Sequence, residues 1–143
     1  MNDNYFMNKA LELAKKAYDL DEVPVGCVVV YNNEIIASGF NRKEIDGIST
    51  SHAEILAIND ACKKLSTWRL DDCILYTTME PCMMCTGAII QSRIGRVVYG
   101  TKNDSFGYLS KVNNNKIIVN GDILKDECLL LLGKFFKEKR DNK

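Results

Sequence analysis

The residues best suited to chemistry are two cysteines three positions apart and a histidine two positions before a glutamate. Cys82 and Cys85 form a Cys-x-x-Cys pair directly after Pro81, and His52 precedes Glu54. Zinc binds thiolate and imidazole readily, and a site with only three protein ligands leaves one zinc position open to water. Such a zinc lowers the pKa of its water toward neutrality. The pattern therefore predicts a catalytic zinc site, with Glu54 as a proton carrier that is not itself a ligand.

Other interpretations of these residues stay open at this point. A Cys-x-x-Cys pair also occurs as a redox pair or as half of a structural zinc site, and a lone histidine at a helix start is often only packed or solvated. A structural zinc that only holds the fold normally needs a fourth protein ligand. The chain has one histidine and no second Cys-x-x-Cys, which favours the catalytic site. The other cysteines stand singly in apolar stretches and are typical of small core residues: Cys27, Cys62, Cys73 and Cys128.

Length, charge and cysteine content limit the class of protein. A chain of 143 residues suits one domain with a real hydrophobic core, spanning 1–143. Its 19 basic and 19 acidic residues cancel, so a nucleic-acid partner would have to be met by a local basic patch. We find no signal peptide and no apolar run long enough to span a bilayer. Together with six cysteines, this predicts a cytoplasmic protein with free thiols and no membrane partner.

Hydrophobic periodicity predicts the elements that must position these residues. Apolar residues at helical spacing predict helices over 4–19, 52–64 and 123–139, and a further helix after Pro81. The predicted strands are a hairpin of 26–31 and 34–39, then 73–78, 96–100 and a short strand at 116–119, with 40–51 as a loop. This order is typical of a layered α/β domain in which 73–78 and 96–100 are parallel neighbours.

The expected helices bring the chemical residues to helix starts. His52 and Glu54 fall in the first turn of one helix, and Pro81 suits the first position of the other. Cys82 and Cys85 then lie on one face of that second helix. We expect the two helix N-termini to converge on one metal ion, because their partial positive charge favours thiolate over thiol.

Longer strings of the chain carry a family resemblance. His52-Ala53-Glu54 with Pro81-Cys82-x-x-Cys85 is the general signature of zinc-dependent nucleobase deaminases. Five strings around it, at 21–27, 39–42, 68–70, 79–85 and 92–100, resemble the bacterial tRNA-specific adenosine deaminases of the cytidine/deoxycytidylate deaminase superfamily. The resemblance is close over residues 5–100 and looser over 121–140.

The resemblance implies a fold, a site and an activity. The fold is a three-layer α/β/α deaminase fold, a five-stranded mixed sheet with helices on both faces, and the protein is a homodimer. The site holds Zn²⁺ on His52, Cys82 and Cys85, with Glu54 as the catalytic proton shuttle and Asn41 against the target base. The activity is hydrolytic deamination of adenosine to inosine at the wobble position of a tRNA anticodon loop.

The chain departs from this family after Gly100. Asn103, at a position expected to contact substrate, stands where the family commonly has Asp. Residues 107–120, which include the polar run 113–115, are shorter than the family segment that helps hold the anticodon loop. An alternative function is therefore that of a small-molecule deaminase acting on a free base or nucleoside, such as guanine or cytosine.

Two surface features would separate these functions. A basic surface from Lys102 and Lys111 to the C-terminal helix would favour tRNA, because local basic groups supply most non-specific nucleic-acid affinity. The basic residues expected on that helix are Lys134, Lys137, Lys139, Arg140 and Lys143. A C-terminal segment that closes the pocket like a lid would favour a free base.

Overall fold

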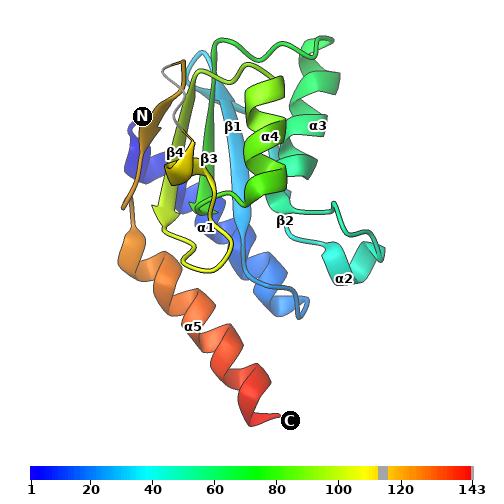
Figure 1. Ribbon diagram of the computed structural model, residues 1–143, viewed down its shortest axis with the longest axis vertical. Helices are drawn as coiled ribbons and strands as arrows, with labels where there is room; N and C mark the ends of the chain where they lie inside the picture. Colours follow the sequence, from blue (N-terminus) through cyan, green and yellow to red (C-terminus); the bar gives the residue numbers. More distant parts are fainter. Residues whose placement is uncertain (113–115, 143) are drawn as a thin grey trace.

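The computed structural model describes residues 1–112 and 116–142 and arranges them in three layers (Figure 1). The middle layer is a five-stranded sheet in the order β2-β1-β3-β4-β5. Its strands are β1 (Gly26–Tyr31), β2 (Glu34–Phe40), β3 (Cys73–Met79), β4 (Arg96–Thr101) and β5 (Ile118–Asn120). β1 runs antiparallel to β2 and β3, whereas β3, β4 and β5 are parallel. The predicted mixed sheet is confirmed; its last strand starts at 118 rather than 116, and 113–115 lie outside the described residues.

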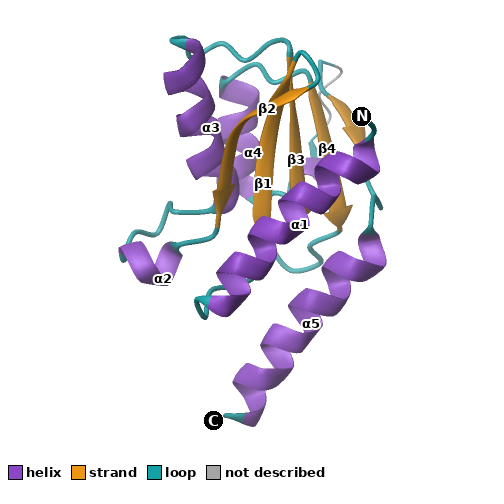
Figure 2. Cartoon of the chain, turned by 180° about the vertical axis from the view of Figure 1, so that it is seen from behind, coloured by secondary structure: helices purple, strands orange, loops and turns teal. Residues whose placement is uncertain are grey.

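Helices cover both faces of the sheet (Figure 2). α1 (Asp3–Asp19) and α5 (Lys125–Asp141) lie on one face, and α3 (Ala53–Leu65) and α4 (Met83–Gln91) lie on the other. A four-residue helix, α2 (Lys43–Asp46), interrupts the predicted 40–51 loop, and a 3₁₀ turn, η1 (Leu109–Lys111), follows β4. No helix among the described residues is both long and apolar enough to cross a bilayer. The predicted α/β/α layering is confirmed.

β1 shows how one strand supports both helical layers. Successive side chains of a strand point to opposite faces of the sheet. Cys27 and Val29 join the core under α3 and α4, whereas Val28 and Val30 join the core under α1. A strand that is buried on both faces needs a continuous apolar run, which is what the sequence supplies here.

Two glycines let the helices approach the sheet closely. A Cβ atom on Gly26 would lie 2.0 Å from the carbonyl oxygen of Ala10 in α1. On Gly39 it would lie 2.5 Å from the carbonyl oxygen of Ala53, the first residue of α3. Larger residues at either position would push the helix away. Gly39 therefore helps to hold the start of α3, where the chemical residues lie, tightly against β2.

A polar network fixes the N-terminal end of α1. The two carboxylate oxygens of Asp3 accept hydrogen bonds from Arg96 Nη1 and Nη2 at 3.1 and 2.7 Å. The Tyr76 hydroxyl donates to the same carboxylate at 2.6 Å, and Arg96 Nε donates to Asn120 Oδ1 at 2.8 Å. The network thus joins α1, β3, β4 and β5 through bidentate, charge-assisted bonds.

α5 packs against α1 and then projects beyond the sheet (Figure 1). Phe135 is buried against Tyr18, whose hydroxyl donates to Glu138. Lys139 forms an ion pair with Asp21 at 2.6 Å. Part of the predicted basic tail is therefore used to dock α5 within the chain.

Candidate metal centre and active site

His52, Cys82 and Cys85 come together although 30 residues separate the first from the second. His52 Nδ1 lies 3.7 Å from Cys82 Sγ and 3.6 Å from Cys85 Sγ, and all three donor atoms lie within 4.8 Å of one another. Tetrahedral zinc with ordinary Zn–N and Zn–S bonds places such atoms about 3.6 Å apart. The three donors therefore fit zinc in type and in spacing.

Both halves of this cluster lie at helix starts. His52 is the N-cap of α3 and Cys82 is the N-cap of α4, so His52 stands just before the helical turn in which it was predicted. Pro81 accordingly precedes the cap, and the prediction that it is the first helical residue is wrong. Among the described contacts the His52 side chain does not cap α3 and is directed at Cys82 instead, whereas Cys82 is hydrogen-bonded both by His52 and by Cys85 of its own helix. Sequence periodicity could not give this detail, because it finds helices but not their caps.

The cluster is electrostatically prepared for a cation. Hydrogen bonds from Cys85 and then from His52 lower the pKa of Cys82 to about 3, so Cys82 is a thiolate. The same bond to Cys82, together with burial, raises the pKa of Cys85, which keeps its proton. A metal ion would displace that proton, since zinc binds cysteine as thiolate.

Glu54 lies in the first turn of α3, two residues beyond His52. Its side chain is only 4% exposed, and this burial raises its pKa to about 7. A carboxyl group with a pKa near the working pH can both accept and release a proton. Because burial rather than a structural ion pair dominates this shift, the environment of Glu54 suits proton transfer.

Asn41 and Asn103, the predicted substrate contacts, both take part in local structure. The Asn41 amide donates to the Val23 carbonyl at 3.2 Å and accepts from the Lys43 N–H at 3.1 Å. Asn103 Oδ1 accepts from the Phe106 N–H at 3.0 Å. These bonds use one of the two amide hydrogens of Asn41 and leave its substrate role, and that of Asn103, as predictions.

Glu22 is a residue that the sequence did not single out. It is 1% exposed, and its two carboxylate oxygens accept the N–H groups of Glu44 and Ile45 at 3.1 and 2.7 Å. The carboxylate thus caps α2, in the segment that leads to His52. Glu22 lies in the 21–27 string that carries the family resemblance, which was the one indication in the sequence. Only the fold shows which N–H groups its carboxylate accepts.

Glu80 plays a similar part on the other side of the cluster. It is 3% exposed and accepts the N–H groups of Asn103 at 3.2 Å and Ser110 at 2.8 Å. Burial opposes ionisation, but the hydrogen bonds from Ser110 and Asn103 outweigh it and lower the pKa of Glu80. The carboxylate fastens the loop after β4 beside Cys82, which forms a backbone bridge with Gly107.

An α/β/α sandwich with a His–Cys–Cys cluster at two helix starts and a buried glutamate beside it defines a class, the hydrolytic nucleobase deaminases. The family model described as MafB19-like deaminase matches residues 1–140. A tRNA-specific adenosine deaminase of Bacillus subtilis is 43% identical, covering 99% of this chain and 92% of the relative. The chain belongs to this deaminase family and, within it, to the branch of the tRNA-specific adenosine deaminases.

Solved structures with the same fold include enzymes of two specificities. A structure from a study of A-to-I editing by tRNA:A34 deaminases is 34% identical with a TM-score of 0.85, covering 89% of this chain and 98% of its own. A guanine deaminase from Nitrosomonas europaea is 28% identical with a TM-score of 0.85, covering 94% of this chain and 84% of its own. The fold is thus common to both specificities, and the substrate must be argued from other features.

Proposed function

We propose that this enzyme converts adenosine to inosine at the wobble position of a tRNA anticodon, with zinc held by His52, Cys82 and Cys85. The observation that carries the proposal is the 43% identity to a tRNA-specific adenosine deaminase over 99% of the chain. Of two guanine deaminases, one is 28% identical over 94% of the chain and the other is 38% identical but covers only 78% of it. A match that extends through the loops as well as the sheet favours a shared substrate more than a shared fold does.

The proton transfers fall to Glu54. Zinc, when bound at three protein ligands, supplies a polarised water molecule as nucleophile. Glu54 would carry the two protons of the attacking water one after the other: the first goes to the purine ring nitrogen, and the second, taken from the oxygen once it is bonded to carbon, goes to the departing amine. The carbon–nitrogen bond to the amino group breaks, a carbon–oxygen bond replaces it, and ammonia leaves. The burial of Glu54 keeps bulk water from competing for these protons.

The position of α5 also supports an RNA substrate. Its main contacts are with α1, β3 and β4, on the face opposite α3 and α4. That is not the lid over the metal cluster that a free-base deaminase was expected to have. Lys102 and Lys111 on the loop after β4, and Lys137 and Arg140 on α5, are exposed to solvent. These side chains can meet phosphates locally although the chain has no net charge.

Deamination of free guanine is the second candidate, because two guanine deaminases superpose on most of the chain. A substrate panel separates the candidates: ammonia release is measured with an anticodon stem-loop RNA, adenosine, guanine and cytosine at equal concentration. We expect turnover of the RNA at least tenfold faster than of any free base. Turnover of guanine with none of RNA would replace the proposed function by the second candidate.

Two further properties belong to this proposal. We propose a homodimer, because α4 leaves Met83 exposed beside the cluster. We also propose a cytoplasmic location, since all six cysteines, each in the described part of the chain, are free thiols.

A further inference from the structure

The loop after β4 carries an exposed aromatic side chain beside the metal cluster. Residues 103–107 form a tight turn, in which the Gly107 N–H donates to the Asn103 carbonyl at 2.9 Å. Phe106 lies in this turn and is 75% exposed. The next residue, Gly107, pairs with Cys82 in an antiparallel bridge. Partners in such a bridge have Cα atoms about 5 Å apart, so the Cα atom of Phe106 lies within roughly 9 Å of that of Cys82.

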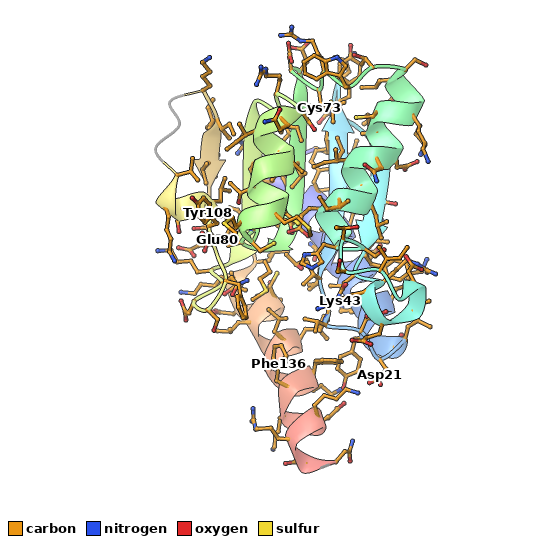
Figure 3. All side chains as sticks on the ribbon, turned by 45° about the vertical axis from the view of Figure 1, so that its right-hand side comes forward. Asp21, Lys43, Cys73, Glu80, Tyr108 and Phe136 are labelled. Carbon is orange, nitrogen blue, oxygen red and sulfur yellow. The ribbon has the colours of Figure 1, made fainter. Side chains whose placement is uncertain are left out.

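The turn is held rigidly. Buried Glu80 accepts a backbone N–H from each side of it, those of Asn103 and Ser110. The Tyr108 N–H donates to the Pro81 carbonyl at 3.0 Å, and Figure 3 shows Tyr108 close to Glu80. A Cβ atom on Gly107 would lie 2.5 Å from Glu80 Oε1, so the backbone and the carboxylate are in direct contact. The exposure of Phe106 is therefore not that of a loose loop.

The surroundings of Phe106 suit a nucleic-acid strand. Lys102 and Lys111, at the two ends of the loop, are both exposed. An exposed aromatic side chain in a loop with a lysine at each end offers stacking for a base and charge neutralisation for the adjoining phosphates. Stacking of this kind accepts any base, because every base has a π-face.

We propose that Phe106 is a stacking subsite for an unpaired base next to the base that reacts. The proposal rests on the proposed function, since it assigns a second contact to the same RNA substrate. It identifies the loop after β4 as the part of the site that distinguishes a nucleotide strand from a free base. Glu80 is then a positioning residue, which acts on the substrate through the loop that it holds.

The test uses full-length Phe106→Ala and Phe106→Trp with an anticodon stem-loop RNA. Each variant is assayed for turnover and, by fluorescence anisotropy, for RNA binding. The same RNA is also made without a base at each position flanking the target. Trp68→Ala is the matched control, because Trp68 is 59% exposed and follows the C-terminal end of α3, about 20 Å along that helix from His52.

We expect Phe106→Ala to raise KM and Kd for intact RNA by about 5- to 100-fold, with kcat within about twofold of wild type. Tryptophan should restore affinity, and Trp68→Ala should change nothing. On the RNA that lacks the stacked base, wild type and Phe106→Ala should bind alike. That loss of difference distinguishes stacking from general damage to the loop.

The outcomes separate this inference from the proposed function. If RNA is deaminated and Phe106→Ala binds it as tightly as wild type does, the stacking subsite is wrong and the function stands. The same holds if Phe106→Ala loses the same affinity, relative to wild type, on every abasic RNA. If RNA binding depends on Phe106 without deamination, the subsite stands and the function fails. If RNA neither binds nor reacts, both are wrong. A change from dimer to monomer in Phe106→Ala would assign the side chain to a subunit contact and overturn the proposal.

Discussion

At the scale of residues, two N-cap positions are occupied by residues suited to bind a metal rather than by residues that stabilise a helix. N-cap positions favour Ser, Thr, Asp and Asn, whose side chains accept the first helical N–H groups. His52 and Cys82 occupy two such positions, and neither is one of the favoured capping residues. Each missing cap costs about 1 kcal/mol. A metal ion that bonds both side chains would offset this cost, so the folded chain is expected to be more stable with zinc than without it.

The metal ligands can be tested by removing one of them. Cys82→Ala should lower bound zinc from about one per chain to a small fraction of that, because two remaining ligands are too few for tight binding. Cys62→Ala is the matched control, since Cys62 is a free thiol outside the cluster. Metal analysis after gel filtration provides the measurement. Full zinc occupancy in Cys82→Ala would contradict the ligand assignment.

Glu54→Gln tests the proton carrier. Glutamine keeps the size of the side chain but cannot carry a proton, so kcat should fall by about two to four orders of magnitude while zinc content and unfolding temperature are retained. Asp60→Asn, a half-exposed acid on the same helix that pairs with Lys64, should keep its activity. Near wild-type turnover by Glu54→Gln would mean that another group moves the protons.

At the scale of elements, the sequence predicted what periodicity encodes and missed what tertiary contacts create. The strands β1 and β3 and the helices α1 and α3 were predictable from their apolar patterns. α2 was not, because the N–H groups of this four-residue helix are accepted by side chains outside it, two by Glu22 and one by Asn41. The apolar run of α4 predicts exposed apolar side chains around the whole helix, Ile89 among them, but Ile89 is fully buried, because the orientation of such a helix is set by its neighbours.

The Asp3 network should make folding stability depend on pH. The hydrogen bonds from Arg96 lower the pKa of the Asp3 carboxyl, so its contribution is complete above the unfolded value near pH 4 and is lost as pH falls through the folded value. Asp3→Asn should lower the free energy of unfolding by about 1 kcal/mol at pH 7. The difference from wild type should shrink below pH 4.

Urea unfolding at pH 7 and at several values below pH 4 measures this difference. Glu12→Gln is the matched control, since Glu12 is an exposed acid on the same helix, 3.7 Å from Lys9. It should have little effect at any pH. A constant difference between Asp3→Asn and wild type at every pH would contradict the role of the ionised carboxylate.

At the scale of the whole molecule, α4 has an apolar face that a single copy of the chain leaves exposed to solvent. Met83 is 67% exposed, and Met84 and Ile90 are only partly buried. Apolar side chains that gather on one helix beside a catalytic site commonly mark an interface. We expect the protein to be a dimer at micromolar concentration and Met83→Asp to shift it toward monomer.

Sedimentation velocity over 1–50 μM, a range of roughly fiftyfold around ordinary dimer affinities, measures the state of both proteins. Leu130→Asp serves as control, because Leu130 is 76% exposed on α5, away from α4. A wild-type protein that stays monomeric over the whole range would contradict the dimer. A Met83→Asp dimer with unchanged affinity would place the interface elsewhere.

The most direct test of the central claim is the identity of the base that the enzyme changes. Unmodified tRNA is incubated with zinc-loaded wild type or with Glu54→Gln, and each position is read by reverse transcription, in which inosine is copied as guanosine. We predict that wild type converts the wobble adenosine, leaves the other adenosines unchanged and does so at least a hundredfold faster than Glu54→Gln. No inosine at the wobble position, or equal conversion by both proteins, would contradict the proposed function.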